Sequence, residues 1–374
     1  MKRTAPVAGA TLIVAILEML GVCGCGSKPI SVQASSVIEG PASPMDLPLV
    51  SGIARSSDGN MIATVSDSKV VKLWDAKSAQ LLHVLQPADN EWLFSPAFSP
   101  DGSVLATASS VSTRTQQFGR LQLWNTATGA RLFTVQGLDW PKCVRFSPLG
   151  NFVIVGATGD LYVVDAATYT LVQHVSRPHS RALVTMGIDP SGNLVATGGQ
   201  DGTIKLWKMP LLEPVRTFNV GTMIVKATVP GEGYGSVPPA SIAFSHDGKL
   251  LAANNTEGTA YVWDLASGNE IVRYDYGPLK HGQLAGGALP DSLAFTSDDR
   301  WLIATDRSGT GLRLLGVAKK NEVLTPIGTH TDVPISAFDA SASNDSVAFV
   351  YRVYSTTGQP ATGKFEIWNL QLPQ

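Results

Sequence analysis

The sequence predicts an all-β fold in which one four-stranded antiparallel unit is written seven times. Composition is the first observation: the chain of 374 residues holds 36 glycines and 23 prolines, and only 16% of it is charged. This mix disfavours a coiled coil or a helical bundle and suits short strands joined by tight turns. The second is a strand–turn–strand pattern that recurs along most of the chain. The third is an additional strand that ends in an aromatic residue in most copies.

The N-terminal segment is predicted to be an export signal. Lys2 and Arg3 precede an apolar run, Val7–Leu17, which ends at Glu18. A basic start, a short apolar stretch and a small-residue exit are typical of a secretory signal. The run is shorter than the ~20 residues that span a bilayer.

The end of this segment resembles a bacterial lipoprotein box, because Val22 and Gly24 stand three and one residues before Cys25. The resemblance implies that residues 1–24 are removed and that Cys25 carries the lipid. A cut before Cys23, a plain signal and an uncleaved anchor stay open as alternatives. On this interpretation the protein is exported to the cell envelope and lipid-anchored to a membrane, on its periplasmic or outer-surface side.

Residues 25–48 are predicted to form a tether, since they are rich in Ser, Pro and Ala, with one strand at Ile30–Ile38. The remaining thiol, Cys143, lies in an apolar run and is predicted to be a buried small hydrophobic residue.

Residues 49–374 contain the repeats. Each copy begins with a strand and a turn that is most often a Ser-x-Asp-Gly sequence, followed by a short apolar strand. The third strand ends in Trp in five copies, and Val164 and Leu314 stand in the other two. The five tryptophans are Trp74, Trp124, Trp207, Trp263 and Trp368. A fourth strand follows in six copies. Four short strands per copy predict propeller blades, and hence a seven-bladed β-propeller.

The last copy has no fourth strand before Gln374, which would leave the edge of its sheet unpaired. We therefore expect Ile30–Ile38 to close this blade from the N-terminal side.

These repeats resemble the WD-repeat β-propeller family over nearly all of the chain after the tether. The fourth copy carries the resemblance best. In the family, a His, a Ser or Thr, an Asp and the Trp form a hydrogen-bonded structural tetrad. The resemblance implies that the tetrad here is formed by His179, Thr197, Asp201 and Trp207.

The sequence offers few groups for chemistry. The Asp-Gly pairs are interpreted as hairpin turns, because both residues suit that backbone. The six histidines are scattered without the paired spacing of a metal site, and a quinone cofactor is disfavoured because Phe133 and Val272 stand where a quinoprotein repeat has Trp. No cofactor and no enzymatic activity are predicted. A net charge of −2 does not indicate nucleic-acid binding.

Two functions stay open. The favoured one is an extracytoplasmic, lipid-anchored and monomeric scaffold that docks an unidentified protein partner. The alternative is a lactonase-like propeller hydrolase with a metal or acid site in the central channel.

Loop lengths predict where the partner docks. Turns between second and third strands, and connections from a fourth strand to the next first strand, meet on one face, and the insertions fall there. The insertions are Ser110–Gly119, Val220–Pro239, Gly277–Pro290 and Ser355–Gly363. The residues expected to contact the partner are Arg114, Phe118, Tyr234, Lys280 and His281.

Overall fold

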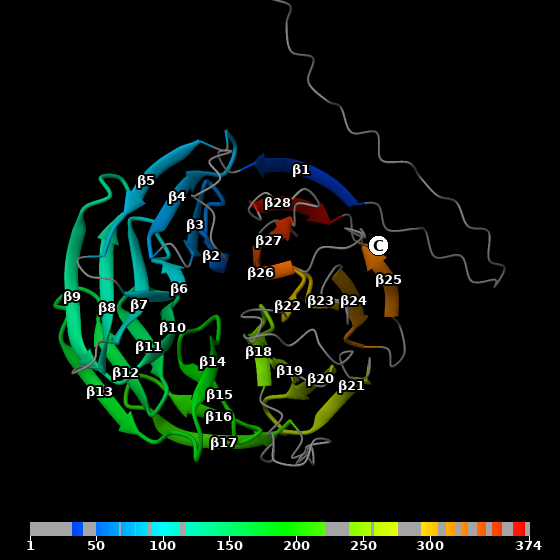
Figure 1. Ribbon diagram of the computed structural model, residues 1–374. Coiled ribbons are helices and arrows are strands. Elements are labelled where there is room, and N and C mark those ends of the chain that lie inside the picture. The colour runs from blue at the N-terminus through cyan, green and yellow to red at the C-terminus, as the bar shows by residue number, and fades with distance from the viewer. Residues whose placement is uncertain are drawn as a thin grey trace, which may run out of the picture. The chain divides into compact units, whose positions relative to one another are not determined.

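The recurring sequence unit folds as a four-stranded antiparallel sheet in the computed structural model (Figure 1). The structure describes residues 32–39, 50–66, 69–78, 80–87, 91–112, 117–220, 239–255, 258–275, 293–305, 312–318, 323–327, 335–341, 346–353 and 362–370. Within these ranges there are strands and turns but no helix, and the strands pair into seven sheets. The predicted all-β class and the four-stranded antiparallel sheets are confirmed.

Six sheets follow the order of the chain. The first contains β2 (Val50–Arg55), β3 (Met61–Ser66), β4 (Val71–Asp75) and β5 (Leu81–Leu85). The second contains β6 (Trp92–Phe98), β7 (Val104–Ser112), β8 (Gln117–Asn125) and β9 (Arg131–Leu138). The third contains β10 (Pro141–Phe146), β11 (Phe152–Ala157), β12 (Asp160–Asp165) and β13 (Leu171–Ser176). The fourth contains β14 (Leu183–Ile188), β15 (Leu194–Gly199), β16 (Thr203–Lys208) and β17 (Glu213–Asn219).

The fifth sheet contains β18 (Pro239–Phe244), β19 (Leu250–Asn255), β20 (Thr259–Asp264) and β21 (Glu270–Asp275). The sixth contains β22 (Leu293–Phe295), β23 (Trp301–Thr305), β24 (Leu312–Gly316) and β25 (Val323–Ile327). The remaining sheet contains β26 (Ile335–Ser341), β27 (Ser346–Val353), β28 (Thr362–Leu370) and, beyond β28, the N-terminal β1 (Val32–Glu39).

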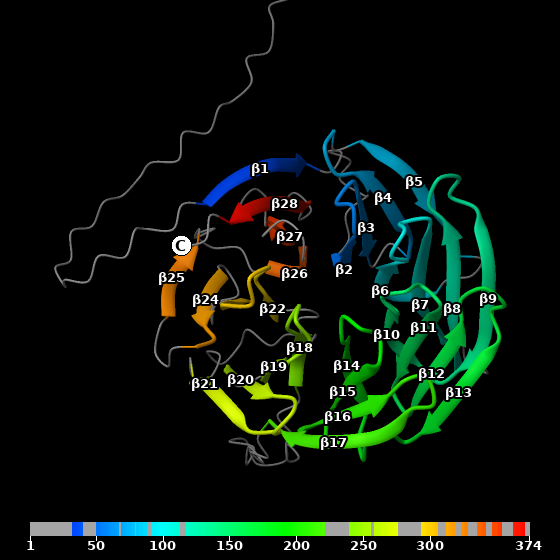
Figure 2. The ribbon, with the colours of Figure 1, turned by 180° about the vertical axis from the view of Figure 1, so that it is seen from behind.

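The pairing of β1 with β28 joins segments from opposite ends of the sequence, and both ribbon views show the two strands side by side (Figures 1 and 2). The register runs from Val32 opposite Leu370 to Glu39 opposite Lys364, with one irregularity between Ala34 and Ser36. The segment that we expected to form a strand, Ile30–Ile38, overlaps most of β1.

The turns between first and second strands use the same chemistry in most sheets. In the second sheet, the Ser99 hydroxyl donates to Asp101 over 2.5 Å and accepts the backbone N–H of Val104 over 2.9 Å. Gly102 has a φ of +72°, a conformation that glycine adopts at little cost. Ser56, Ser245 and Thr296 make the same hydroxyl-to-carboxylate bond in their sheets. The interpretation of the Asp-Gly pairs as hairpin turns is therefore confirmed in these turns.

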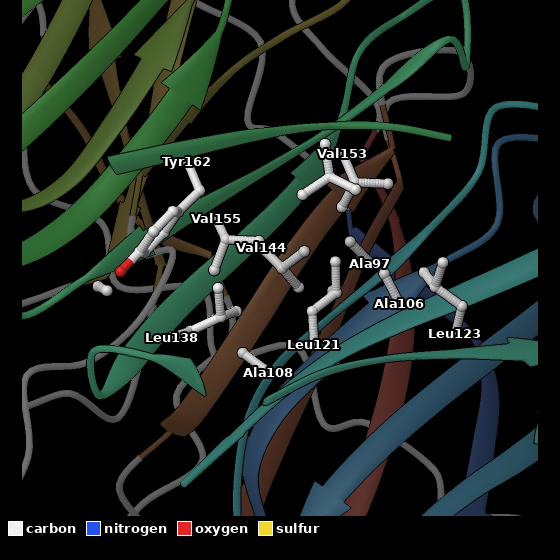
Figure 3. Close-up of a cluster of buried hydrophobic side chains, with 12 residues drawn as sticks. Ala97, Ala106, Ala108, Leu121, Leu123, Leu138, Val144, Val153, Val155 and Tyr162 are labelled. Carbon is white, nitrogen blue, oxygen red and sulfur yellow. The ribbon is translucent and has the colours of Figure 1, made fainter. Parts of the chain in front are cut away.

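The core lies between neighbouring sheets, because inner strands such as β11, β12 and β20 are buried along most of their length. Figure 3 shows one such layer, in which Ala106, Ala108 and Leu121 of the second sheet face Val144 and Val155 of the third. Alanine on one side and valine or leucine on the other allow the two sheets to approach closely.

The first strands of successive sheets contact one another, and Figure 1 shows them on the inner side of the sheets. Contacts run from β2 to β6, β10, β14, β18 and β22 in turn, and β26 also contacts β2.

Outer strands add a second kind of contact between sheets. Side chains of several fourth strands reach the turn between the third and fourth strands of the next sheet. The ring of Phe133 on β9 stacks on Tyr169, with centroids 4.8 Å apart. The other contacts are hydrogen bonds to backbone carbonyls, from His83 to Ala127 (3.0 Å), Gln173 to Leu211 (2.9 Å) and Arg216 to Leu265 (3.1 Å). These side chains link each of the first four sheets to its successor.

One predicted insertion differs from expectation. Between Ser110 and Gly119 the second and third strands continue, with Val111 opposite Phe118 and Ser112 opposite Gln117. This connection is an extended ribbon of β7 and β8 because its residues complete the ladder of hydrogen bonds. Only residues 113–116 of it lie outside the described residues.

Candidate functional site

The structure brings the four predicted tetrad residues together at one end of the fourth sheet. His179 lies in the connection from β13 to β14, Thr197 on β15, Asp201 in the turn that follows, and Trp207 on β16. His179 Nε2 lies 2.9 Å from Thr197 Oγ1, and the indole N–H of Trp207 donates to the same hydroxyl over 2.8 Å. His179 Nδ1 lies 3.2 Å from Asp201 Oδ1. One row of hydrogen bonds therefore links β15 and β16 to the connection before β14 and to the turn between β15 and β16.

Electrostatics sets the direction of these hydrogen bonds. Burial lowers the pKa of the His179 imidazole, although the charge of Asp201 opposes this. Burial acts to raise the pKa of Asp201, but the hydrogen bond from Thr203 and the interaction with His179 outweigh it and leave this pKa below its ordinary value. Near neutral pH a neutral His179 therefore donates its Nδ1 proton to an ionised Asp201, and its Nε2 accepts the Thr197 hydroxyl.

Gly199 is what makes room for His179. A Cβ at this position would lie 2.4 Å from the His179 ring, closer than real contacts allow. The tetrad therefore needs glycine two residues after Thr197, a requirement that our sequence analysis did not recognise.

Part of the tetrad recurs in other sheets. The indole N–H of Trp124 donates to Thr107 over 3.0 Å, and that of Trp74 donates to Thr64 over 2.9 Å. The tetrad is thus reduced to a threonine–tryptophan pair in the first two sheets.

In the second sheet a buried carboxylate replaces the histidine. Glu91, immediately before β6, is fully buried and accepts hydrogen bonds from Ser109 and Arg120, and from Gln122 over 2.7 Å. Arg120 and Gln122 precede Trp124 by four and two residues, as Thr203 and Lys205 precede Trp207.

Glu91 was not predicted from the sequence, because a single Glu in a connection between strands resembles any acidic residue of the protein surface. The available signal was Ser109, which stands where the fourth sheet requires Gly199.

The turn carboxylates are occupied by local donors. Asp264 Oδ1 accepts the backbone N–H and the hydroxyl of Ser267, each over 2.7 Å, and these bonds lower its pKa. Asp165 is held in the same way by Thr168, which lowers its pKa as well. Such acids stabilise turns, and one oxygen of each carboxylate is already engaged.

No observation in the described part of the chain supports the alternative of a propeller hydrolase. There, no group of three or more His, Cys, Asp or Glu side chains is placed to hold a metal ion. Ser176, His174 and Asp160 are close together, but both the Ser176 hydroxyl (3.4 Å) and Asp160 (3.0 Å) approach Nε2 of His174. A serine–histidine–aspartate relay needs the two partners on different ring nitrogens.

Most of the residues predicted to contact a partner lie outside the described residues, namely Arg114, Tyr234, Lys280 and His281, and so does Cys25. Phe118 is described: it lies on β8, half-buried, and its ring centroid is 4.9 Å from the guanidinium carbon of Arg120. Cys143 is buried, as predicted.

Comparison with known proteins identifies the repeat. The family model described as "WD domain, G-beta repeat" matches residues 38–75, 169–208 and 227–264. The second match contains all four tetrad residues, and each match ends at or just after the tryptophan of a third strand. The chain contains WD40 repeats. The four-stranded antiparallel sheets are consistent with a WD40 β-propeller.

Relatives with WD40 repeats are similar over parts of this chain. "WD repeat-containing protein 55" of Pongo abelii is 23% identical over 283 residues, which cover 66% of this chain and 70% of the relative. "Protein tipD" of Dictyostelium discoideum is 24% identical over 59% of this chain and 40% of its own length. "Telomerase protein component 1" of Mus musculus is 24% identical over 56% of this chain. That match spans only 9% of the mouse protein.

These relatives correct the predicted location. They are eukaryotic proteins, one of them a telomerase component and another a "Nuclear distribution protein PAC1", so the comparison points to the inside of a eukaryotic cell. The prediction of an exported protein, lipid-anchored in a bacterial cell envelope, is therefore wrong. It depended on two basic residues, a short apolar run and the placement of Val22 and Gly24 before Cys25, a pattern too short and too general to identify a lipoprotein signal. None of the described residues forms a helix long and apolar enough to cross a membrane.

Proposed function

We propose that this chain is a closed, seven-bladed WD40 propeller that acts as a monomeric protein-interaction scaffold. WD40 proteins bind protein partners, and the matched WD40 repeats support the same activity for this chain. The observation that carries the proposal is the placement of the insertions at one end of a rigid set of sheets.

Closure is supported by contacts at both ends of the repeat array. The last sheet receives β1 as its fourth strand, and its first strand, β26, contacts β2 of the first sheet. A blade completed by the N-terminal strand ties the two ends of the chain together and leaves no unpaired edge on β28.

The partner is proposed to dock on the long-loop face, defined by the second-to-third turns and by the connections from each fourth strand to the next first strand. The opposite face consists of short turns whose polar groups are engaged internally, as at Ser99 and Asp264. The largest insertions of the long-loop face, residues 221–238 and 276–292, lie outside the described residues. Their sequences include Tyr234, Lys280 and His281, side chains suited to anchoring an interface.

Loop trimming tests this assignment. Replacing residues 221–238 and Gly277–Pro290 by short turns should abolish capture of the native partner after mild crosslinking. The urea midpoint should change little, because insertions in exposed loops contribute little to stability. A Lys77→Ala variant, in a short turn of the opposite face, is the control and should retain capture. Capture by the trimmed chain, or its loss in Lys77→Ala alone, would refute the proposed face.

A further inference from the structure

The first strands carry an extra residue near their start in six of the seven described sheets. At this point the register with the second strand shifts by one, which is the geometry of a β-bulge. The bulged residues are Ser51, Ser95, Lys142, Val184, Ala240 and Ser336. Five of them are small or aliphatic, and Lys142 alone is charged. Bulges change the direction of a side chain and are common beside functional sites.

Lys142 is held by aromatic rings from two sheets. Its Nζ lies 4.5 Å from the centroid of the Phe94 ring on β6 and 5.6 Å from that of Trp140, the residue before β10. A cation over an aromatic face gains about 0.5–2 kcal/mol. Arg145 Nη1 also donates to Ser95 Oγ over 3.0 Å, which ties β10 to β6 beside the same site. The ammonium group therefore has a defined position.

The charge of Lys142 is not neutralised within the described chain, where no carboxylate forms an ion pair with it. The side chain is half-buried, and this burial lowers the pKa of its ammonium group. An ammonium group that has lost part of its hydration and has no counter-charge gains more from an incoming anion than an exposed lysine does. Because its position is already defined, less side-chain entropy is lost when the anion binds.

We propose that Lys142, held between Phe94 and Trp140, binds a carboxylate side chain in an acidic segment of the protein partner. The site lies at the connection from β9 to β10 and therefore on the long-loop face. The inference rests on the proposed function and adds the chemistry of the docked segment.

An acidic peptide fits this site better than a nucleic acid does. Nucleic-acid sites present open aromatic faces for base stacking and several basic groups along the backbone. Here Lys142 itself lies over one face of each ring.

Fluorescence anisotropy with a labelled peptide of six glutamates tests the proposal on the full chain. Lys142→Met keeps the aliphatic stem against Phe94 and Trp140 but removes the charge. It should raise the Kd of this peptide at least tenfold, which is about 1.4 kcal/mol. Lys77→Met, a matched lysine change on the opposite face, should leave the Kd within twofold. The reversed charge in Lys142→Glu should make a labelled peptide of six lysines bind more tightly than it binds the unchanged chain.

Three results would overturn the inference. They are no binding of the glutamate peptide to the unchanged chain, equal Kd values for Lys142→Met and Lys77→Met, or tighter Lys142-dependent binding of a labelled single-stranded oligonucleotide. The urea midpoint of Lys142→Met, compared with that of the unchanged chain, verifies that the variant is folded. Loop trimming leaves Lys142 in place and is scored on the native partner. If the peptide Kd does not depend on Lys142 but loop trimming abolishes capture of the native partner, only the acidic segment is refuted. If the trimmed chain still captures the partner, the docking face itself is refuted.

Discussion

Replacing Thr197 with valine removes the hydroxyl that joins Trp207 to His179 and keeps the volume of the side chain. The hydroxyl has two buried partners, the indole N–H at 2.8 Å and the imidazole Nε2 at 2.9 Å. A buried polar group left without its partner costs about 1–3 kcal/mol, so two such groups should lower the free energy of unfolding by about 2–6 kcal/mol. In Thr107→Val only the indole of Trp124 loses its partner, and the cost should be about 1–3 kcal/mol.

Thr107 is a matched control because both threonines are completely buried, at 0% exposure, and both tryptophans are nearly so. Urea unfolding of the two variants, followed by tryptophan fluorescence and circular dichroism, gives the difference between them. We expect Thr197→Val to be the less stable variant by about 1–3 kcal/mol, the contribution of the hydrogen bond to His179. Thr197→Ser, which keeps the hydroxyl, should recover this difference. If Thr197→Val is no less stable than Thr107→Val, then His179 and Asp201 do not stabilise the fourth sheet.

Three further outcomes are expected. Glu91→Gln should lower the free energy of unfolding in urea by about 3–5 kcal/mol, because it leaves Arg120 buried without a counter-charge, whereas Glu270→Gln in an exposed pair should cost at most about 1 kcal/mol. Deleting residues 32–39 should cost several kcal/mol, since β28 loses its ladder partner, and an unchanged melting temperature would contradict closure. The side-chain and backbone hydrogen bonds of Lys249 lower the pKa of Asp247 to about 2. The stabilisation by ionised Asp247 is therefore complete above about pH 4 and is lost as the pH falls through about 2. Asp247→Asn should make the free energy of unfolding depend less on pH between about 4 and 2, and should not change its pH dependence near 7.

The sequence predicts the sheets well because their signals are local. An Asp-Gly turn, the apolar second strand and the tryptophan of the third strand lie within about thirty residues of one another, as from Ser99 to Trp124. The tetrad was placed by the resemblance of the fourth copy to the WD-repeat family, and hydrogen bonds link its four side chains. The N-terminal segment shows the limit of such patterns, since its basic residues, apolar run and cysteine box occur once and are not supported by further copies in the sequence.

The order of strands, the chemistry of the turns and the hydrogen-bonded row at His179 were determined by the sequence alone, because each depends on the spacing of residues within one repeat. The tertiary structure alone decided which side chains from distant positions meet, both within one sheet and between neighbouring sheets. Arg120 faces Glu91 from 29 positions away, and the ring of Phe94 reaches Lys142 from the preceding sheet. The repeat pattern of the sequence does not predict these side-chain contacts, because they depend on the strand register at each bulge and on how closely neighbouring sheets pack.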